Sequence, residues 1–137
     1  MSDNLRHAAC ACGQLRATTR GEPVRVSVCH CNNCRRRSGS LFAAQARWPD
    51  DKVEITGESR EWVKVGEEGG HAAFRFCPDC GSTVSYTLDA LPGLTAIAMG
   101  AFAGHEGNAP LPPPQYEVFH DRAPKWLHLE GIERPYD

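Results

Sequence analysis

The sequence predicts a single, mainly β domain that spans residues 1–137. Three observations carry this prediction. Apolar and polar residues alternate in short runs, as they do in strands. Thirteen glycines and ten prolines favour many turns, and no segment shows the long amphipathic repeat of a surface helix. A chain of this length buries roughly two-thirds of its unfolded surface, so we expect one real hydrophobic core.

The first half of the chain contains three expected strands. Residues 24–28 alternate and lead directly into Cys29. Residues 53–55 and 62–65 lie on either side of Gly57, and we expect them to form a hairpin.

The second half continues the pattern around a turn that contains two cysteines. Residues 74–76 run into residues 77–80, and residues 84–88 follow, so this turn is expected to join two strands. Residues 94–102 are apolar and predict a buried strand, with a short helix as the alternative.

The last part of the chain contains a stiff connector and a final expected strand. Four prolines among residues 110–114 exclude regular structure there. Residues 116–119 then predict a strand.

All seven cysteines fall into three short groups. Their number is odd, and the first thirteen residues lack the basic flank and apolar run of a secretory signal, so disulfides are the weaker interpretation. Thiolates with no carboxylate cluster favour zinc, with iron as the alternative. The groups are Cys10 and Cys12; Cys29, Cys31 and Cys34; and Cys77 and Cys80.

Seven thiolates divide into a set of four and a set of three, which predicts two zinc ions per chain. Four thiolates make a closed, structural site, whereas three leave a tetrahedral position open to water or substrate. The middle group already supplies three ligands, so the closed site is expected to join Cys10 and Cys12 to Cys77 and Cys80. In the alternative assignment, His30 completes the middle group as a closed site. If that segment is extended, His30 instead points away from its neighbours.

Charge and hydropathy exclude several classes of partner. Lys and Arg number 15 and Asp and Glu 17, for a formal net charge of −2, which argues against nucleic acid as the main partner. Seven thiolates against two zinc ions would make the protein three charges more negative still. The mean hydropathy is −0.45 and no apolar run is long enough for a membrane span, so we expect a cytoplasmic protein without membrane contact. The edge strands of a small β domain would allow a homodimer.

The three motifs together resemble the glutathione-dependent formaldehyde-activating enzyme family, a zinc-binding domain also seen in centromere protein V. The resemblance covers about residues 9–130. It rests on Cys10-Ala11-Cys12-Gly13, on Cys29-His30-Cys31-Asn32-Asn33-Cys34-Arg35-Arg36-Arg37-Ser38-Gly39, on Phe76-Cys77-Pro78-Asp79-Cys80-Gly81-Ser82, and on the segments Tyr116-Glu117-Val118-Phe119-His120 and Ala123-Pro124-Lys125-Trp126.

This resemblance implies an all-β zinc fold of packed antiparallel sheets, of the β-tent type. It implies the same partition, with Cys10, Cys12, Cys77 and Cys80 on a structural zinc and Cys29, Cys31 and Cys34 on a catalytic one. The activity it implies joins formaldehyde to glutathione as S-hydroxymethylglutathione, in reverse a carbon–sulfur lyase reaction. The implied partners are therefore a small thiol, such as glutathione as co-substrate, and an aldehyde.

The open site predicts thiol chemistry on its own. A metal-bound thiol loses its proton, and the resulting thiolate can attack an aldehyde carbon. His30, Ser38 or water would deliver the proton to the developing alkoxide. Arg35 and Arg36 would bind the carboxylates of an acidic substrate such as glutathione, or lie in a solvated basic turn.

Two other functions fit the same motifs. A non-catalytic, zinc-stabilised interaction module would have two closed sites and no thiol affinity. A redox sensor would release zinc reversibly from the three-cysteine group on oxidation.

Overall fold

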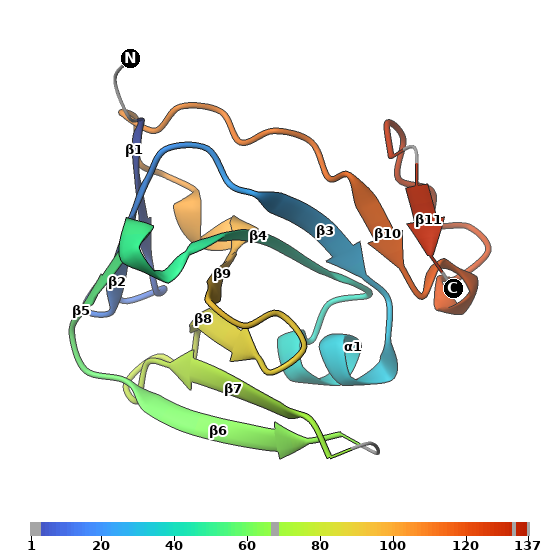
Figure 1. Cartoon of the computed structure of the whole chain (residues 1–137), viewed down its shortest axis with the longest axis horizontal. Coiled ribbons are helices and arrows are strands. Elements are labelled where there is room, and N and C mark those ends of the chain that lie inside the picture. Colours follow the sequence, from blue (N-terminus) through green and yellow to red (C-terminus); the bar gives the residue numbers. More distant parts are fainter. Residues whose placement is uncertain (1–3, 67–68, 133, 137) are drawn as a thin grey trace.

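The computed structural model describes residues 4–66, 69–132 and 134–136, which form two β-sheets and one short α-helix (Figure 1). The small sheet is antiparallel, with the strands in the order β1 (Leu5–Ala9), β2 (Arg16–Arg20) and β5 (Val53–Thr56). The large sheet has the order β11 (Arg134–Tyr136), β10 (Tyr116–Val118), β3 (Arg25–Cys29), β4 (Ala43–Pro49), β9 (Leu94–Ala98), β8 (Thr83–Leu88), β7 (His71–Phe76) and β6 (Arg60–Val65). The helix α1 (Asn32–Ser38) lies between β3 and β4 in the chain, and the 3₁₀ helices are η1 (Asp50–Lys52), η2 (Met99–Phe102) and η3 (His120–Arg122). The prediction of a mainly β fold with packed sheets is therefore confirmed.

The main core lies between the two sheets. Alternation places Ala8 of β1 and Ala17 of β2 against Trp48, Val84 and Ile97 of the large sheet. The Trp48 side chain is fully buried, and its indole Nε1 donates a hydrogen bond of 3.0 Å to the Gly21 carbonyl, so burial leaves no unpaired donor there. The small sheet is consequently fixed against one end of the large sheet, on the left in Figure 1.

A smaller cluster lies under α1. It contains Phe74 of β7 and Tyr86 of β8, whose ring centroids are 5.1 Å apart. The Arg37 guanidinium of α1 covers both rings at 4.5 and 4.9 Å. Since α1 buries no side chain fully, this cationic contact and the packing of α1 on β4 hold the helix against the sheet.

Most of the predicted strands are present. The runs at residues 24–28, 74–76, 84–88 and 116–119 correspond to β3, β7, β8 and β10, and the turn between β7 and β8 carries Cys77 and Cys80. Residues 94–102 form a buried strand only as far as Ala98 and then continue as η2. The proline-rich connector has no regular structure.

The predicted hairpin of residues 53–55 and 62–65 is wrong. β5 pairs with β2 in the small sheet, whereas β6 pairs with β7 in the large one. The chain changes sheets at Gly57, which has φ of 97°. Beside it, the Gln14 side chain donates to the Glu58 carbonyl at 2.7 Å and accepts from the Glu58 amide at 2.9 Å, which turns the chain away from β5.

Two further features differ from the expected all-antiparallel sheets. β10 pairs in parallel with both β3 and β11, because the long proline-rich connector carries the chain back along the molecule before β10 begins. The segment after Cys29, considered as extended in the sequence, becomes α1 after Cys31. Within the described residues, no helix has the length and apolarity that a membrane span requires.

Candidate functional site

The four outer cysteines converge where the two sheets meet. The sulfur atoms of Cys10, Cys12, Cys77 and Cys80 all lie within 4.8 Å of one another, although the two pairs come from the β1–β2 and β7–β8 turns. The Sγ atom of Cys12 is 3.6 Å from that of Cys10 and 3.7 Å from that of Cys77. Four sulfurs about 2.3 Å from a common tetrahedral centre lie roughly 3.8 Å apart, so this set fits a zinc ion.

Hydrogen-bond donors around this four-cysteine cluster favour thiolates. The Leu15 amide donates to Cys10 Sγ at 3.2 Å, and the Gln14 side chain donates to Cys77 Sγ at 3.0 Å. A hydrogen bond with the Ser82 hydroxyl lowers the pKa of Cys80 to about 5. The Gln14 backbone lowers the pKa of Cys12, but the neighbouring sulfurs, Cys10 first, and burial outweigh it and raise that pKa to about 12, so a bound cation is what would make all four sulfurs thiolates.

The three middle cysteines form a second cluster at the start of α1. Cys29 ends β3, Cys31 is the N-cap of the helix and Cys34 lies in its first turn, with all three sulfurs within 4.8 Å of one another. Cys31 Sγ accepts a hydrogen bond of 3.2 Å from the Cys34 amide, the role that Ser or Asp usually fills at an N-cap. The helix cap thus also fixes the spacing of the sulfurs.

Charge is unevenly shared in this three-cysteine cluster. Hydrogen bonds from Cys29 and Cys34 lower the pKa of the Cys31 thiol to about 2, and the contact with Cys31 raises the pKa of Cys29 above its ordinary value. A divalent cation would remove this competition, because it stabilises every thiolate that binds it. Three sulfurs with no fourth ligand atom beside them among the described residues fit an open zinc site.

A groove of about 760 Å³ lies beside Cys31. Its described lining residues include four cationic side chains and two aromatic rings but no Asp or Glu, so the groove favours an anionic ligand. The cations are Arg36, Arg37, Lys64 and Arg122, and the rings are Trp62 and Phe119.

The backbone at the groove is strained at Phe119. This residue follows β10 and has φ of 55°, in the left-handed region that non-glycine residues rarely occupy. The strained turn places the Phe119 ring in the groove, with the Arg122 guanidinium 4.7 Å from its centroid. Such strain is typical of binding sites, where the surrounding structure maintains it.

Comparison with known proteins agrees with this geometry. The family model described as "Glutathione-dependent formaldehyde-activating enzyme" matches residues 5–122. The chain belongs to this family. A search of curated proteins finds no match. A crystal structure of a Rhodobacter sphaeroides protein, solved as a structural genomics target, has the same fold: its TM-score is 0.57 at 19% sequence identity, over 72% of this chain and 89% of that chain.

In this member of the formaldehyde-activating family, His30 lies apart from the sulfurs. Its ring is fully buried, its Nε2 is 2.7 Å from Glu117 Oε2, and its amide donates to the Val118 carbonyl at 2.9 Å. Its Nδ1 has no partner among the described residues. His30 is not part of the described set of converging ligand atoms, so the closed site with a histidine ligand receives no support. Its contacts connect the three-cysteine cluster to β10.

Ser38 and the arginines of α1 have separate surroundings. The Ser38 hydroxyl donates to the Cys34 carbonyl at 2.6 Å, inside the helix. Arg35 donates to the Arg122 carbonyl at 3.3 Å, whereas Arg36 lines the groove. Of the two expected glutathione contacts, Arg36 is therefore the one placed beside Cys31.

Among the charged and aromatic residues of the groove, sequence reasoning missed four, namely Trp62, Lys64, Phe119 and Arg122. The first two belong to β6, and no sequence signal pointed to them because β6 was paired with the wrong strand. Phe119 lies within the motif that begins at Tyr116 and Arg122 follows it closely, so the family-like closing segment was the available signal.

Proposed function

We propose that this protein is a zinc-dependent carbon–sulfur lyase of the glutathione-dependent formaldehyde-activating type. Its substrate is the adduct of a small anionic thiol and an aldehyde, such as S-hydroxymethylglutathione, which the lyase reaction splits into glutathione and formaldehyde. In the condensation direction, glutathione and the aldehyde are the co-substrates. The observation that supports this most directly is the groove beside Cys31, whose described lining residues include four cationic side chains and neither Asp nor Glu. This observation supports ligand binding more directly than catalysis, because the charged side chains of the groove select a ligand by its charge.

The groove residues would hold glutathione by its ends. Glutathione carries two carboxylates, and guanidinium groups bind carboxylates in a planar, two-pronged geometry. Arg36 and Arg122 line the groove from different elements and would bind one carboxylate each, and Lys64 adds a third positive charge. Trp62 and Phe119 would cover the apolar stem of the peptide.

The cysteines Cys29, Cys31 and Cys34 would hold the zinc ion. Zinc in a three-thiolate site supplies a Lewis acid with one open position, which favours the thiolate form of an incoming sulfur. In the condensation, the sulfur attacks the aldehyde carbon, the C–S bond forms, and the carbonyl electron pair moves to oxygen and takes up a proton. The thiol supplies one proton overall, so the reaction balances without another reactant, and the reverse reaction breaks the same C–S bond.

Water in the groove is the proton donor that these contacts favour. The Ser38 hydroxyl is bound to the Cys34 carbonyl, and His30 Nε2 is buried against Glu117. Neither atom reaches substrate without breaking a hydrogen bond of 2.7 Å or less.

Calorimetric titration of the zinc-loaded protein with glutathione tests the proposal. The variants R36Q and R122Q should each weaken glutathione binding roughly tenfold, since a charge-assisted hydrogen bond contributes about 1.5 kcal/mol. Uncharged 2-mercaptoethanol should bind all variants equally. The control R20Q changes an exposed arginine of β2 outside the groove and should bind as wild type.

The same samples test catalysis. Exchange NMR should show faster interconversion of formaldehyde and S-hydroxymethylglutathione with wild type than with buffer, and a lower rate with R36Q. Equal glutathione affinity for R36Q, R122Q and R20Q would contradict the proposed binding mode. Glutathione binding without accelerated exchange would contradict the lyase and favour a non-catalytic module.

A further inference from the structure

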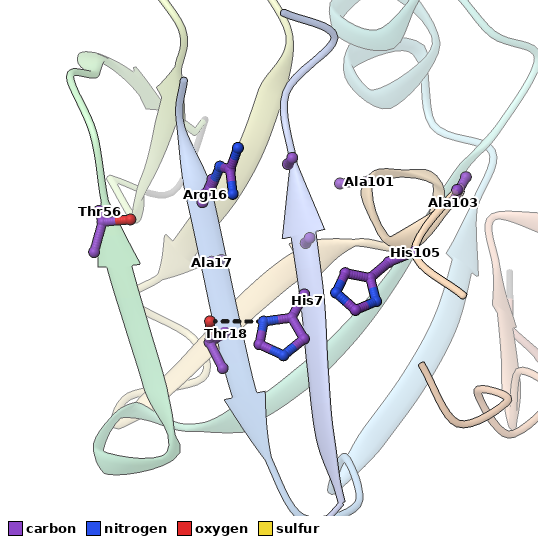
Figure 2. Close-up of a pocket in the computed structure, with 11 residues that line it drawn as sticks. His7, Arg16, Ala17, Thr18, Thr56, Ala101, Ala103 and His105 are labelled. Atoms are coloured by element: carbon purple, nitrogen blue, oxygen red, sulfur yellow. Dashed lines mark hydrogen bonds between the residues drawn. The ribbon is translucent and has the colours of Figure 1, made fainter. Parts of the chain in front are cut away.

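The outer face of the small sheet carries a separate hollow, of about 390 Å³ (Figure 2). The strand register pairs His7 with Thr18 and Ala9 with Arg16, so these four side chains share the face opposite to the core. The segment that follows η2 forms the other wall and carries His105.

Two histidines stack across this hollow. The centroids of the His7 and His105 rings are 4.6 Å apart with an interplanar angle of 21°, and the two residues come from segments far apart in the chain. The Gly107 amide donates to His105 Nδ1 at 3.2 Å, so in the neutral ring the proton lies on Nε2 and this atom is a donor. His7 Nδ1 is 3.3 Å from the Thr18 hydroxyl. The pair is thus held in place by neighbours on both walls.

The remaining polar groups of the hollow are donors or hydroxyls. Arg16 uses its Nε on the Gly13 carbonyl at 2.7 Å, and its Nη atoms have no partner among the described residues. Thr18 and Thr56 add hydroxyls, and no Asp or Glu is among the described lining residues. In a chain with a formal net charge of −2, such a concentration of cationic and donor groups is local rather than a property of the whole surface.

Small side chains make the hollow deep enough for a ligand. The rest of its described lining consists of the backbone of Ala8 and Ala17, whose methyl groups face the core, and of the small residues Ala9, Ala101, Ala103 and Gly104, which leave room between the polar groups. Small residues between hydrogen-bond donors are a combination that fits a small organic anion.

We propose that this hollow is a second ligand site, which binds the oxyanion group, carboxylate or phosphate, of a small metabolite. The two imidazoles would bind the oxyanion, Arg16 would add its positive charge from the end of the hollow near Gly13, and the small wall residues would contact the rest of the ligand. The hollow and the groove beside Cys31 share no lining residue, so this site does not depend on the proposed lyase activity.

Histidine side-chain NMR on the zinc-loaded protein tests the site. The protein is titrated with inorganic phosphate in one series and with succinate in the other, with chloride keeping the ionic strength constant because exposed charges are screened by salt. We expect saturable shifts of the His7 and His105 signals and none of the exposed His128. A tighter response to phosphate assigns a phosphate ligand, and a tighter response to succinate assigns a carboxylate.

Three variants make the test specific. H105Q removes one imidazole, and A103L fills the hollow without changing its charge; each should weaken anion binding at least fivefold. The matched control H128Q should bind as wild type. The proposal is overturned if neither anion gives saturable shifts, or if H105Q and A103L both bind as tightly as H128Q.

Discussion

Gly57 is the residue on which the separation of the two sheets depends. Its φ of 97° is unfavourable for any residue with a side chain, and a Cβ at this position would overlap the Gln14 carbonyl oxygen. The same stretch of chain carries the two hydrogen bonds between the Gln14 side chain and Glu58. Both features force the chain to leave the small sheet after β5.

We therefore expect Gly57→Ala to lower the free energy of unfolding by about 3 kcal/mol, from left-handed strain and overpacking together. Gly93→Ala is the matched control, because Gly93 has φ of 78° but its new methyl group would meet no described atom within 4 Å beyond its chain neighbours. Gly93→Ala should therefore lower the free energy of unfolding only by the backbone strain, about 1 kcal/mol. Urea unfolding measures the free energy of unfolding of both variants. Equal losses for the two variants would show that the contact with Gln14 is not the limiting feature.

At the scale of elements, β10 is the strand that completes the groove. It lies in parallel beside β3, and the buried contact between His30 Nε2 and Glu117 Oε2 joins the two strands at 2.7 Å. Phe119 and Arg122, which line the groove, follow directly after β10. The position of these two side chains thus depends on the pairing of β10.

Removal of the Glu117 carboxylate should loosen this strand. Glu117→Ala leaves His30 Nε2 unpaired in a buried position, which should cost about 2 kcal/mol of stability. It should also weaken glutathione binding, because Arg122 loses its support. Glu117→Gln keeps an oxygen and should retain most of both. Hydrogen exchange of the His30 amide, which donates to the Val118 carbonyl, and calorimetry check this, and unchanged exchange in Glu117→Ala would contradict it.

The strands and the helix also show how much of the fold can be predicted from the sequence. Alternation predicted β3, β7 and β8, since it reports that a strand has one buried face. It does not report which strand lies alongside, and the hairpin assigned to β5 and β6 was therefore wrong. The helix α1 escaped prediction because its N-cap is a cysteine and it buries no apolar side chain.

The candidate site also has a part that the sequence predicts and a part that it does not. Spacing alone grouped the cysteines correctly, because C-x-C and C-x-x-C turns bring sulfurs together locally, and the count left four and three. The groove could not be predicted, since Lys64 and Arg122 reach Cys31 only through the order of strands in the large sheet. The contact of His30 with Glu117 likewise depends on tertiary structure, whereas the contact of Ser38 with Cys34 lies within α1, which the sequence did not predict.

For the whole molecule, the two cysteine clusters have different positions relative to the core. The four-cysteine cluster joins the small sheet to the β7–β8 turn, and the Ala11 amide adds a hydrogen bond of 3.1 Å to the Ser82 hydroxyl across the same junction. The three-cysteine cluster lies within one stretch of six residues, between β3 and α1. Only the first connects segments that are far apart in the chain.

Loss of one cysteine ligand should therefore affect the stability of the fold and the binding of thiols differently at the two clusters. Cys77→Ser should lower zinc content from two to one per chain and destabilise the fold by at least about 3 kcal/mol, because metal binding there is coupled to folding. Cys31→Ser should also lose one zinc but cost only about 1 kcal/mol, while thiol binding disappears. Metal analysis by mass spectrometry, urea unfolding and calorimetry with glutathione measure the three quantities on the same samples.

Comparing Cys31→Ser with Cys77→Ser distinguishes a structural role of the three-cysteine cluster from an open zinc site. If Cys31→Ser unfolds the protein as severely as Cys77→Ser, both clusters hold the fold together, and the three-cysteine cluster no longer supports a lyase. If wild type binds only one zinc, the open site fails at the first step. A folded Cys31→Ser variant that has lost one zinc and all thiol affinity, beside a wild type with two, is the result that an open three-cysteine site requires, because only there does an incoming sulfur take the fourth position.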